Sequence, residues 1–268
     1  MAIKEYARAS LLHFLLGDKM LKIYTVDTDY NDYLMQFDIN VKLNSGDKEN
    51  RPYIGVLFEI NKLKYFAPMA SPRPKHKRMR NSIDFEKIKN GQYGAINFNN
   101  MIPVKEKNIS LIDINNIQDL KYKILLINQY NYINLNSKRL KNKAKNLYNL
   151  IINNRADNKL KIRCANYLLL EEKCKLYIPE FYIYQDKEQG KLVVFTEEKT
   201  EDRYNLYSTI KVPKDQIGTV KEVKQLSDLT TFALIDENNK NKSFYSTISK
   251  KVYETIDKLN EATQSIIQ

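Results

Sequence analysis

Apolar and polar residues alternate along several short stretches in the first two thirds of the chain, as expected for half-buried β-strands. The run from Leu21 to Val26 alternates in this way and predicts the first strand. Asp27 follows it and suits the N-cap of a helix over residues 30–37, where apolar side chains recur at helical spacing. The chain therefore opens with a strand and a short helix.

A β-hairpin is predicted next. Residues 51–60 form a largely apolar run, and residues 65–69 return as an antiparallel partner after a tight connection. Because antiparallel partners bring the start of one strand beside the end of the other, Arg51 is expected near the strand end that leads to Ser71.

The same reasoning gives the remaining elements of this part. Strands are expected at 84–88 and 93–98, with a turn at residues 90–91 between them. Apolar residues alternate at the start of residues 109–116, and the segment then turns. Helices are expected at 120–132, 137–153 and 165–176. The pattern changes at Pro179, where we place a domain boundary. Beyond it, strands are expected at 181–184, 191–196, 206–212, 217–223 and 230–235, with a closing amphipathic helix at 247–260. Residues 179–268 are thus predicted to be a small α+β accessory domain, whose role the sequence does not indicate.

Charge separates the two parts. The 268-residue chain has a net charge of +12, made up of +14 in residues 1–179 and −2 in residues 180–268. A basic first part favours nucleic acid or an anionic surface as its partner. The chain has no apolar run of about 18 residues, so we expect a soluble cytoplasmic protein without a membrane span. Residues 1–19 are interpreted as an N-terminal extension with a short amphipathic helix, because the flanks of its apolar run do not suit a signal peptide.

Basic side chains concentrate directly behind Ser71. They are Arg73, Lys75, His76, Lys77, Arg78 and Arg80. Pro68, Pro72 and Pro74 predict a stiff, extended loop that cannot join a helix. Lysine and arginine neutralise phosphates and a serine hydroxyl donates to a phosphate oxygen, so the loop suits a polyanion, with a solvated basic loop as the alternative. A second set of cations lies on the helix expected at 137–153 and indicates either a solvated face or a phosphate-contacting surface: Lys138, Arg139, Lys141, Lys143 and Lys145.

The sequence favours chemistry without a metal or another cofactor. Asp27, Asp29 and Asp32 are interpreted as the cap and first turn of a helix rather than as ligands. The two cysteines, Cys164 and Cys174, fit reduced thiols, and with two histidines at no recognisable spacing they do not predict a zinc site. In RNA the 2′-oxygen attacks its own phosphate, which requires charge compensation and proton transfer rather than a protein nucleophile.

Several motifs in one order resemble the ToxN/AbiQ endoribonuclease toxins of type III toxin–antitoxin and phage abortive-infection systems. The resemblance covers about residues 20–178 and rests on residues 21–26, 51–56, 65–68, 71–77, 94–104 and 167–173. It implies an α+β fold, with a compact, highly curved antiparallel sheet and flanking helices related to the Kid/MazF toxins. It also implies metal-independent cleavage of A-rich single-stranded RNA through a 2′,3′-cyclic phosphate. The implied partners are cellular and phage RNA substrates and a small repeated antitoxin RNA that inhibits the toxin in ring-like assemblies.

The resemblance also assigns site residues. The family loop usually reads Ser-Pro-Lys after a hydroxyl residue, and its serine matches Ser71. Arg73 stands where the family has lysine, and Ala70 stands in place of the preceding hydroxyl. Because arginine does not shuttle protons near neutral pH, Arg73 is expected to stabilise charge, leaving Lys75 or His76 as substitutes.

The expected site therefore has two groups of residues. The expected catalytic set is Ser71, Arg73, Arg51, Lys75 and His76. The expected RNA-binding set is Lys77, Arg78, Arg80, Lys138, Arg139, Lys141 and Lys145. The departures at Ala70 and Arg73 keep a second hypothesis open, a non-catalytic protein that sequesters a structured RNA.

Overall fold

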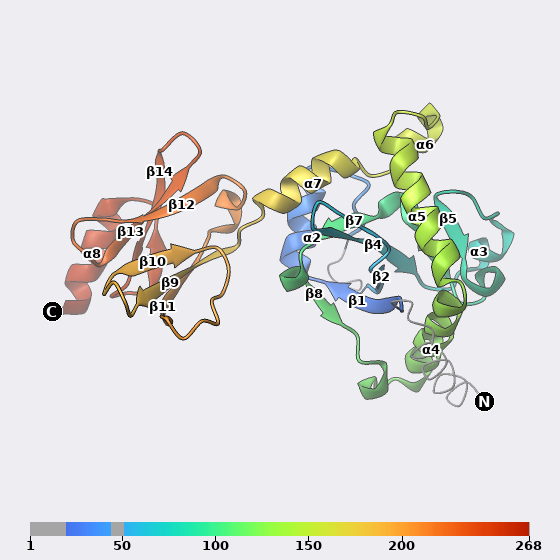
Figure 1. Ribbon diagram of the computed structural model, residues 1–268, viewed down its shortest axis with the longest axis horizontal. Helices are drawn as coiled ribbons and strands as arrows, with labels where there is room; N and C mark the ends of the chain where they lie inside the picture. The colour runs from blue at the N-terminus through green and yellow to red at the C-terminus, as the bar shows by residue number, and fades with distance from the viewer. Residues whose placement is uncertain (1–19, 44–50, 268) are drawn as a thin grey trace. The chain divides into compact units, whose positions relative to one another are not determined.

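The computed structural model describes residues 20–43 and 51–267, and the expectations for residues 1–19 lie outside this range. The chain divides into two compact units, one ending at Cys174 and the other beginning at Lys175. The boundary that we expected at Pro179 lies a few residues after this division. The elements of each unit are coloured along the chain in Figure 1.

An antiparallel sheet forms the centre of the first unit, and the α+β class is confirmed. Its strands run in the order β5-β6-β4-β2-β1-β8, while β3 and β7 also pair with β4. The bounds are β1 (Lys22–Val26), β2 (Tyr53–Gly55), β3 (Glu59–Ile60), β4 (Leu63–Ala70), β5 (Phe85–Lys87), β6 (Ala95–Asn97), β7 (Ile102–Val104) and β8 (Ile109–Leu111). The first half of β4 pairs with β3 and β7, and the second half with β2 and β6. A strand that changes neighbours in this way makes a corner in the sheet.

Residues 51–60 do not form the single strand that we predicted. The structure divides them into β2 and β3, and the ladder is interrupted after Gly55. A β-carbon at Gly55 would lie 2.2 Å from the ring of Phe66, so this ring covers the glycine directly. A glycine inside a strand gives the ladder no side chain to pack, which explains the break.

Helices flank this sheet, most of them at the predicted places. They are α2 (Thr28–Met35), α4 (Leu120–Leu135), α5 (Ser137–Ile152), α6 (Asn158–Arg163) and α7 (Tyr167–Leu176). Asp27 caps α2 as predicted, with its side chain 2.8 Å from the amide of Tyr30. The short helix α6 was not predicted, although Asp157 caps it in the same way.

Two polar contacts fix the core of the first unit. The buried carboxylate of Glu171 accepts hydrogen bonds from the hydroxyls of Tyr65, at 2.8 Å, and Tyr148, at 2.7 Å. Burial, together with this carboxylate, raises the pKa of both tyrosines. In the second contact, the side chain of Asn134 binds both the amide and the carbonyl of Leu21, which fastens α4 to the start of β1.

The second unit contains two antiparallel sheets and a helix. The first sheet has the order β10-β9-β11 and the second β12-β13-β14-β15. The bounds are β9 (Glu180–Asp186), β10 (Leu192–Phe195), β11 (Tyr204–Lys211), β12 (Val220–Gln225), β13 (Thr231–Asp236), β14 (Asn241–Ser246), β15 (Lys251–Tyr253) and α8 (Ile256–Ile267). The unit has a hydrophobic core of its own, which includes Phe181, Ile183, Ile210, Phe232 and Leu234.

The helix predicted at 247–260 is wrong in its first half. Residues 251–253 form β15, and α8 begins at Ile256. The reason is a second hairpin, in which Phe244 pairs with Tyr253 and Lys250 takes a positive φ in the turn. None of the helices in the described residues combines the length and apolar character needed to cross a bilayer.

Candidate functional site

Ser71 lies exposed at the end of β4, where the predicted hairpin is confirmed. Tyr53 pairs with Pro68, and the amide of Met69 donates to the carbonyl of Pro52 at 2.8 Å. This register brings the backbone of Arg51 beside the end of β4, next to Ser71. The backbones of two residues of the expected catalytic set therefore lie close together, where β2 begins and β4 ends.

Two glycines support the backbone around Ser71. Gly94 has a φ of +91°, and a β-carbon there would lie 2.0 Å from the carbonyl oxygen of Ala70. Gly91 has a φ of +86°, and a β-carbon there would lie 2.7 Å from the backbone of His76. Both positions therefore require glycine, for their conformation and for the close approach of neighbouring backbone. The sequence predicted a turn at residues 90–91 but not its contact with the Ser71 loop.

The basic segment is not the extended loop that we predicted. Residues Pro74–Arg78 form a single helical turn, α3, in which the amide of Met79 donates to the carbonyl of Lys75 at 3.0 Å. The proline argument was wrong here because Pro74 occupies the first helical turn, where a missing amide costs nothing and the fixed φ suits the helix. Ser71, Arg73 and Lys75 are exposed at its start. The exposed cations of the RNA-binding set follow on and after the turn: Lys77, Arg78 and Arg80.

His76 is separated from these cations by burial. Its side chain is 2% exposed, its ring centroid lies 6.1 Å from that of Phe85, and Nδ1 has no hydrogen-bond partner among the described residues. Burial lowers the pKa of His76, and the charges of Lys75 and Arg73 lower it further. The neutral ring of His76 therefore lies on the buried face of α3, not among the exposed cations.

The structure adds Lys42 to the residues near this edge. The Nε of Arg51 donates to the carbonyl of Leu43 at 3.2 Å, which brings the 41–43 segment beside the start of the hairpin. Burial and the neighbouring charge of Arg51 lower the pKa of Lys42. No motif in the sequence singles out Lys42, because its proximity to Arg51 comes from the pairing of segments.

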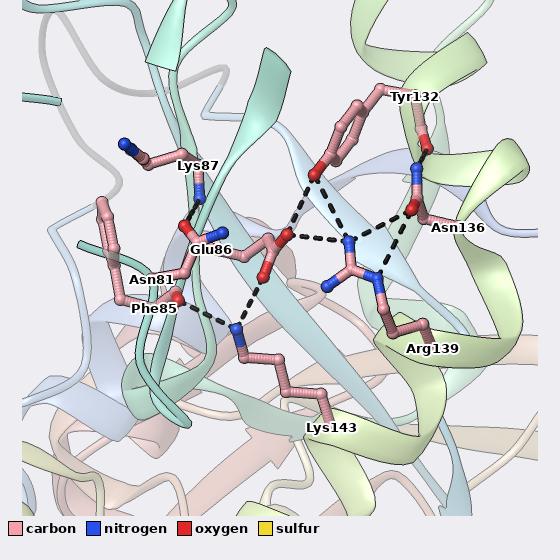
Figure 2. A network of polar contacts seen from close by, with 8 residues as sticks. All are labelled: Asn81, Phe85, Glu86, Lys87, Tyr132, Asn136, Arg139 and Lys143. Atoms are coloured by element: carbon pink, nitrogen blue, oxygen red, sulfur yellow. Dashed lines mark hydrogen bonds and ion pairs between the residues drawn. The ribbon is translucent and has the colours of Figure 1, made fainter. Parts of the chain in front are cut away.

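The cations of α5 do not share one environment. Figure 2 shows that the carboxylate of Glu86 on β5 accepts hydrogen bonds from Arg139 and Lys143 of α5 and from Tyr132 of α4. The distances to the carboxylate oxygens are 2.8 Å from Arg139 Nη2, 2.6 Å from Lys143 Nζ and 2.9 Å from the Tyr132 hydroxyl. Glu86 is buried, with a side chain that is 1% exposed; burial raises its pKa, and these three hydrogen bonds outweigh that effect and keep the pKa below its ordinary value.

The other three cations that we expected to bind RNA along α5 are placed differently. Lys138 and Lys145 are exposed, and Lys141 is half-buried. Sequence reasoning missed Glu86, because its partners are more than 40 residues away and leave no local pattern. Among the described residues, no group of three or more histidine, cysteine or acidic side chains is arranged to hold a metal ion.

Comparisons with known proteins agree on one family. The family model for "Toxin ToxN, type III toxin-antitoxin system" matches residues 22–175. The chain is similar to the endoribonuclease ToxN of Pectobacterium atrosepticum, at 35% identity over 179 residues, which cover 63% of this chain and 99% of the relative.

Two solved structures are similar to the chain over the same extent. One is of a type III system in which a non-coding RNA pseudoknot selectively inhibits the toxin; it has a TM-score of 0.51 and 32% identity and covers 59% of this chain and 97% of its own. The other is AbiQ, a lactococcal anti-phage endoribonuclease of a type III system, with a TM-score of 0.50, 25% identity and coverage of 59% and 97%.

Proposed function

This chain belongs to the ToxN family of toxins from type III toxin–antitoxin systems, and we propose that it is an endoribonuclease inhibited by an RNA antitoxin. The observation that carries the proposal is the exposed Ser71 at the end of β4, with Arg51 beside it and Arg73 and Lys75 directly after it. A hydroxyl among cations suits a phosphodiester, because the cations offset the charge that develops on phosphorus oxygens.

We infer that cleavage proceeds by transesterification within the RNA, without a metal. The 2′-oxygen forms a bond to the adjacent phosphorus while the bond from phosphorus to the 5′-oxygen breaks. The products are a 2′,3′-cyclic phosphate and a 5′-hydroxyl. The proton of the 2′-hydroxyl leaves to water, and Lys75 protonates the departing 5′-oxygen.

The remaining site residues support this reaction in different ways. Ser71 donates a hydrogen bond to a non-bridging phosphate oxygen, and Arg51 and Arg73 stabilise the charge of the phosphorane. His76 was expected to take part in proton transfer. Because its ring is buried and neutral, we now propose that it positions α3 rather than contacting substrate.

The biological setting follows from the same premise. We propose that the substrates are A-rich single-stranded RNAs of the cell and of infecting phage, so that the toxin acts in the cytoplasm in phage defence by abortive infection. We also propose that a small repeated RNA inhibits it in ring-like protein–RNA assemblies, in line with the pseudoknot inhibition described for a similar structure.

Substitution of Ser71 tests the cleavage proposal. Wild type and Ser71→Ala are compared on an A-rich RNA in the presence of EDTA. We expect the variant to lose about 2–4 kcal/mol of transition-state stabilisation, because it lacks a donor to the reacting phosphate. Ser110→Ala, a change at an exposed serine on β8, is the matched control. Undiminished cleavage by Ser71→Ala would overturn the role of this serine, and loss of wild-type cleavage in EDTA would overturn the metal-free reaction.

A non-catalytic protein that sequesters a structured RNA is the second candidate, favoured by Ala70 and Arg73 at positions where the family has other residues. Expression with and without the repeat RNA separates the two. Growth arrest that the RNA relieves supports the toxin. Indifference of growth, together with RNA binding but no cleavage, supports the binder.

A further inference from the structure

An open groove lies beyond the Ser71 site, between the segment leading into β5 and the corner of α4 and α5. Its volume is about 930 Å³, at the upper end of the range of roughly 300–1,000 Å³ for ligand pockets. The groove lies next to α3, as two hydrogen bonds show. Asn81 lines the groove and accepts a hydrogen bond from the amide of Lys87. The Nζ of Lys87 in turn donates to the carbonyl of Lys77 on α3. The groove therefore adjoins the basic segment of α3.

The groove presents positive charge to a ligand. Lys138 and Arg139 line it and are exposed, and Nη1 of Arg139 has no partner among the described residues. Glu86 also lines the groove, but its carboxylate is buried and is paired with Arg139 and Lys143 (Figure 2). The hydrogen bonds of this network hold the guanidinium of Arg139 in place, and Glu86 offers little negative charge to an incoming phosphate.

Amide side chains on the same wall are available for hydrogen bonding. Asn142 and Asn146 lie one helical turn apart on α5, line the groove, are exposed and make no side-chain hydrogen bond within the described part of the chain. An amide offers one acceptor and two donors, which is the pattern that reads the edge of a nucleobase. Leu135, which is 78% exposed, adds an apolar surface against which a base can pack.

We propose that this groove is a second RNA subsite, which holds nucleotides beyond the scissile position in single-stranded form. In it, Lys138 and Arg139 bind phosphates, and Asn142 and Asn146 bind base edges. The inference rests on the proposed function, since it takes RNA as the ligand of the first unit. It also divides the cations of α5, because Lys141 and Lys145 do not line the groove.

Binding of a non-cleavable RNA to the full chain tests the subsite. The probe is a single-stranded, 2′-O-methylated A-rich oligonucleotide of about 20 nucleotides, longer than the roughly 4–16 nucleotides that a single-strand-binding fold covers. We expect the double change Asn142→Ala and Asn146→Ala to weaken binding about tenfold with an unchanged salt dependence, because amides contribute hydrogen bonds and no charge. Asn149→Ala, at an exposed asparagine of α5 that does not line the groove, is the control.

The charge of the groove is tested with the same probe. Lys138→Ala should weaken binding and reduce the slope of log affinity against log salt by about 1, because one phosphate contact is lost. Lys159→Ala removes an exposed cation of α6 outside the groove and should leave the slope unchanged. Wild-type affinity and slope in both groove variants would overturn the proposal.

Cleavage assays keep this proposal distinct from the proposed function. If the chain is a nuclease, the groove variants should raise KM and leave kcat unchanged, because the replaced side chains bind nucleotides that are distant from the reacting phosphate. If the wild-type protein binds the probe but cleaves no RNA, the nuclease proposal fails while the proposal of an RNA subsite in the groove still stands. Repeating the binding assay with the RNA that co-purifies with the chain identifies the source of the occupant. Weaker binding of the single-stranded probe supports the subsite. Weaker binding of the co-purified RNA alone overturns it and assigns the groove to the inhibitor, and unchanged binding of both RNAs also overturns it.

Discussion

Gly94 lies so close to the carbonyl oxygen of Ala70 that the Ser71 loop depends on the absence of a side chain at this position. We expect Gly94→Ala to lower the free energy of unfolding by about 1–3 kcal/mol and to reduce cleavage, because the new methyl group displaces the backbone before Ser71. Denaturant unfolding and the cleavage assay measure the two effects.

Gly190 supplies the matched control for this change. It also has a positive φ, of +66°, but a β-carbon there would meet nothing within 4 Å. Gly190→Ala should therefore lose stability through backbone strain alone and keep full cleavage. Equal cleavage in both variants would contradict the role of Gly94 in supporting the loop.

His76 should make stability depend on pH. Because its pKa in the folded state lies below the ordinary value of 6.5, the unfolded chain binds more protons as the solution is acidified. The stabilising contribution of the neutral ring is therefore complete above about pH 6.5 and is lost as the pH falls through this value toward the folded-state pKa. Denaturant unfolding at about pH 7.5 and about pH 5.5 measures the loss.

The comparison with His76→Asn isolates this effect. The variant has no group titrating at this position, so its unfolding free energy should change less between the two pH values than that of wild type. His13 is present in both proteins and cancels. An identical pH dependence in the two proteins would show that His76 does not contribute.

At the scale of elements, the cations around α3 fall into two groups that should affect different kinetic constants. Arg51 and Lys75 lie at the Ser71 end, whereas Lys77, Arg78 and Arg80 lie farther along the basic segment. Replacing the first two with alanine should lower kcat, because they act on the developing charge and the leaving oxygen. Replacing the other three should raise KM and flatten the salt dependence, because they hold phosphates.

Steady-state kinetics at several salt concentrations distinguish the groups. Changes of similar size in kcat and KM from both sets of substitutions would refute the division. The groove variants of α5 provide a reference, since they are expected to act on KM alone.

Most elements of the sheet could be predicted, because apolar alternation and turn residues are local signals. Leu21–Val26 and the hairpin that leads to Ser71 are examples. The structure differs from the predictions in two kinds of place. In one, a residue that usually breaks helices is tolerated at a particular helix position, and in the other, strand pairing outweighs helix propensity. Pro74 begins a helical turn rather than preventing one, and residues 251–253 join a hairpin rather than a helix.

The candidate site could be predicted only in part, for the same reason. Ser71 and its cations are contiguous and therefore visible in the sequence. The burial of His76 and the pairing of Glu86 with Arg139 depend on contacts between distant segments, which no local pattern records. The glycines at 91 and 94 were visible as a turn and a motif, but their close contacts with backbone were not.

For the whole molecule, the second unit should be dispensable for cleavage. It has its own hydrophobic core and, counted from residue 180, a net charge of −2, whereas the family match lies within residues 22–175. A protein truncated after Ile178 should therefore cleave RNA with wild-type kcat. We propose that residues 179–268 serve assembly, so the truncated protein should form smaller complexes with its inhibitory RNA.

Light scattering of the RNA complex and a cleavage assay check this prediction together. Increased cleavage of large RNAs by the truncated protein would instead indicate that the second unit shields the site. Unchanged complexes and unchanged cleavage would assign the unit to some other partner.

The hydrogen bonds from Tyr65 and Tyr148 to Glu171 have an optical consequence. The chain has 19 tyrosines and no tryptophan, so its intrinsic fluorescence comes from tyrosine alone. Transfer of the phenol proton to a hydrogen-bonded carboxylate in the excited state quenches tyrosine emission, so we expect these two rings to emit weakly in the folded protein. We expect their emission to increase when the first unit unfolds. Emission should therefore rise on denaturation, and Glu171→Gln should brighten the folded state, giving a label-free signal for the unit that carries Ser71.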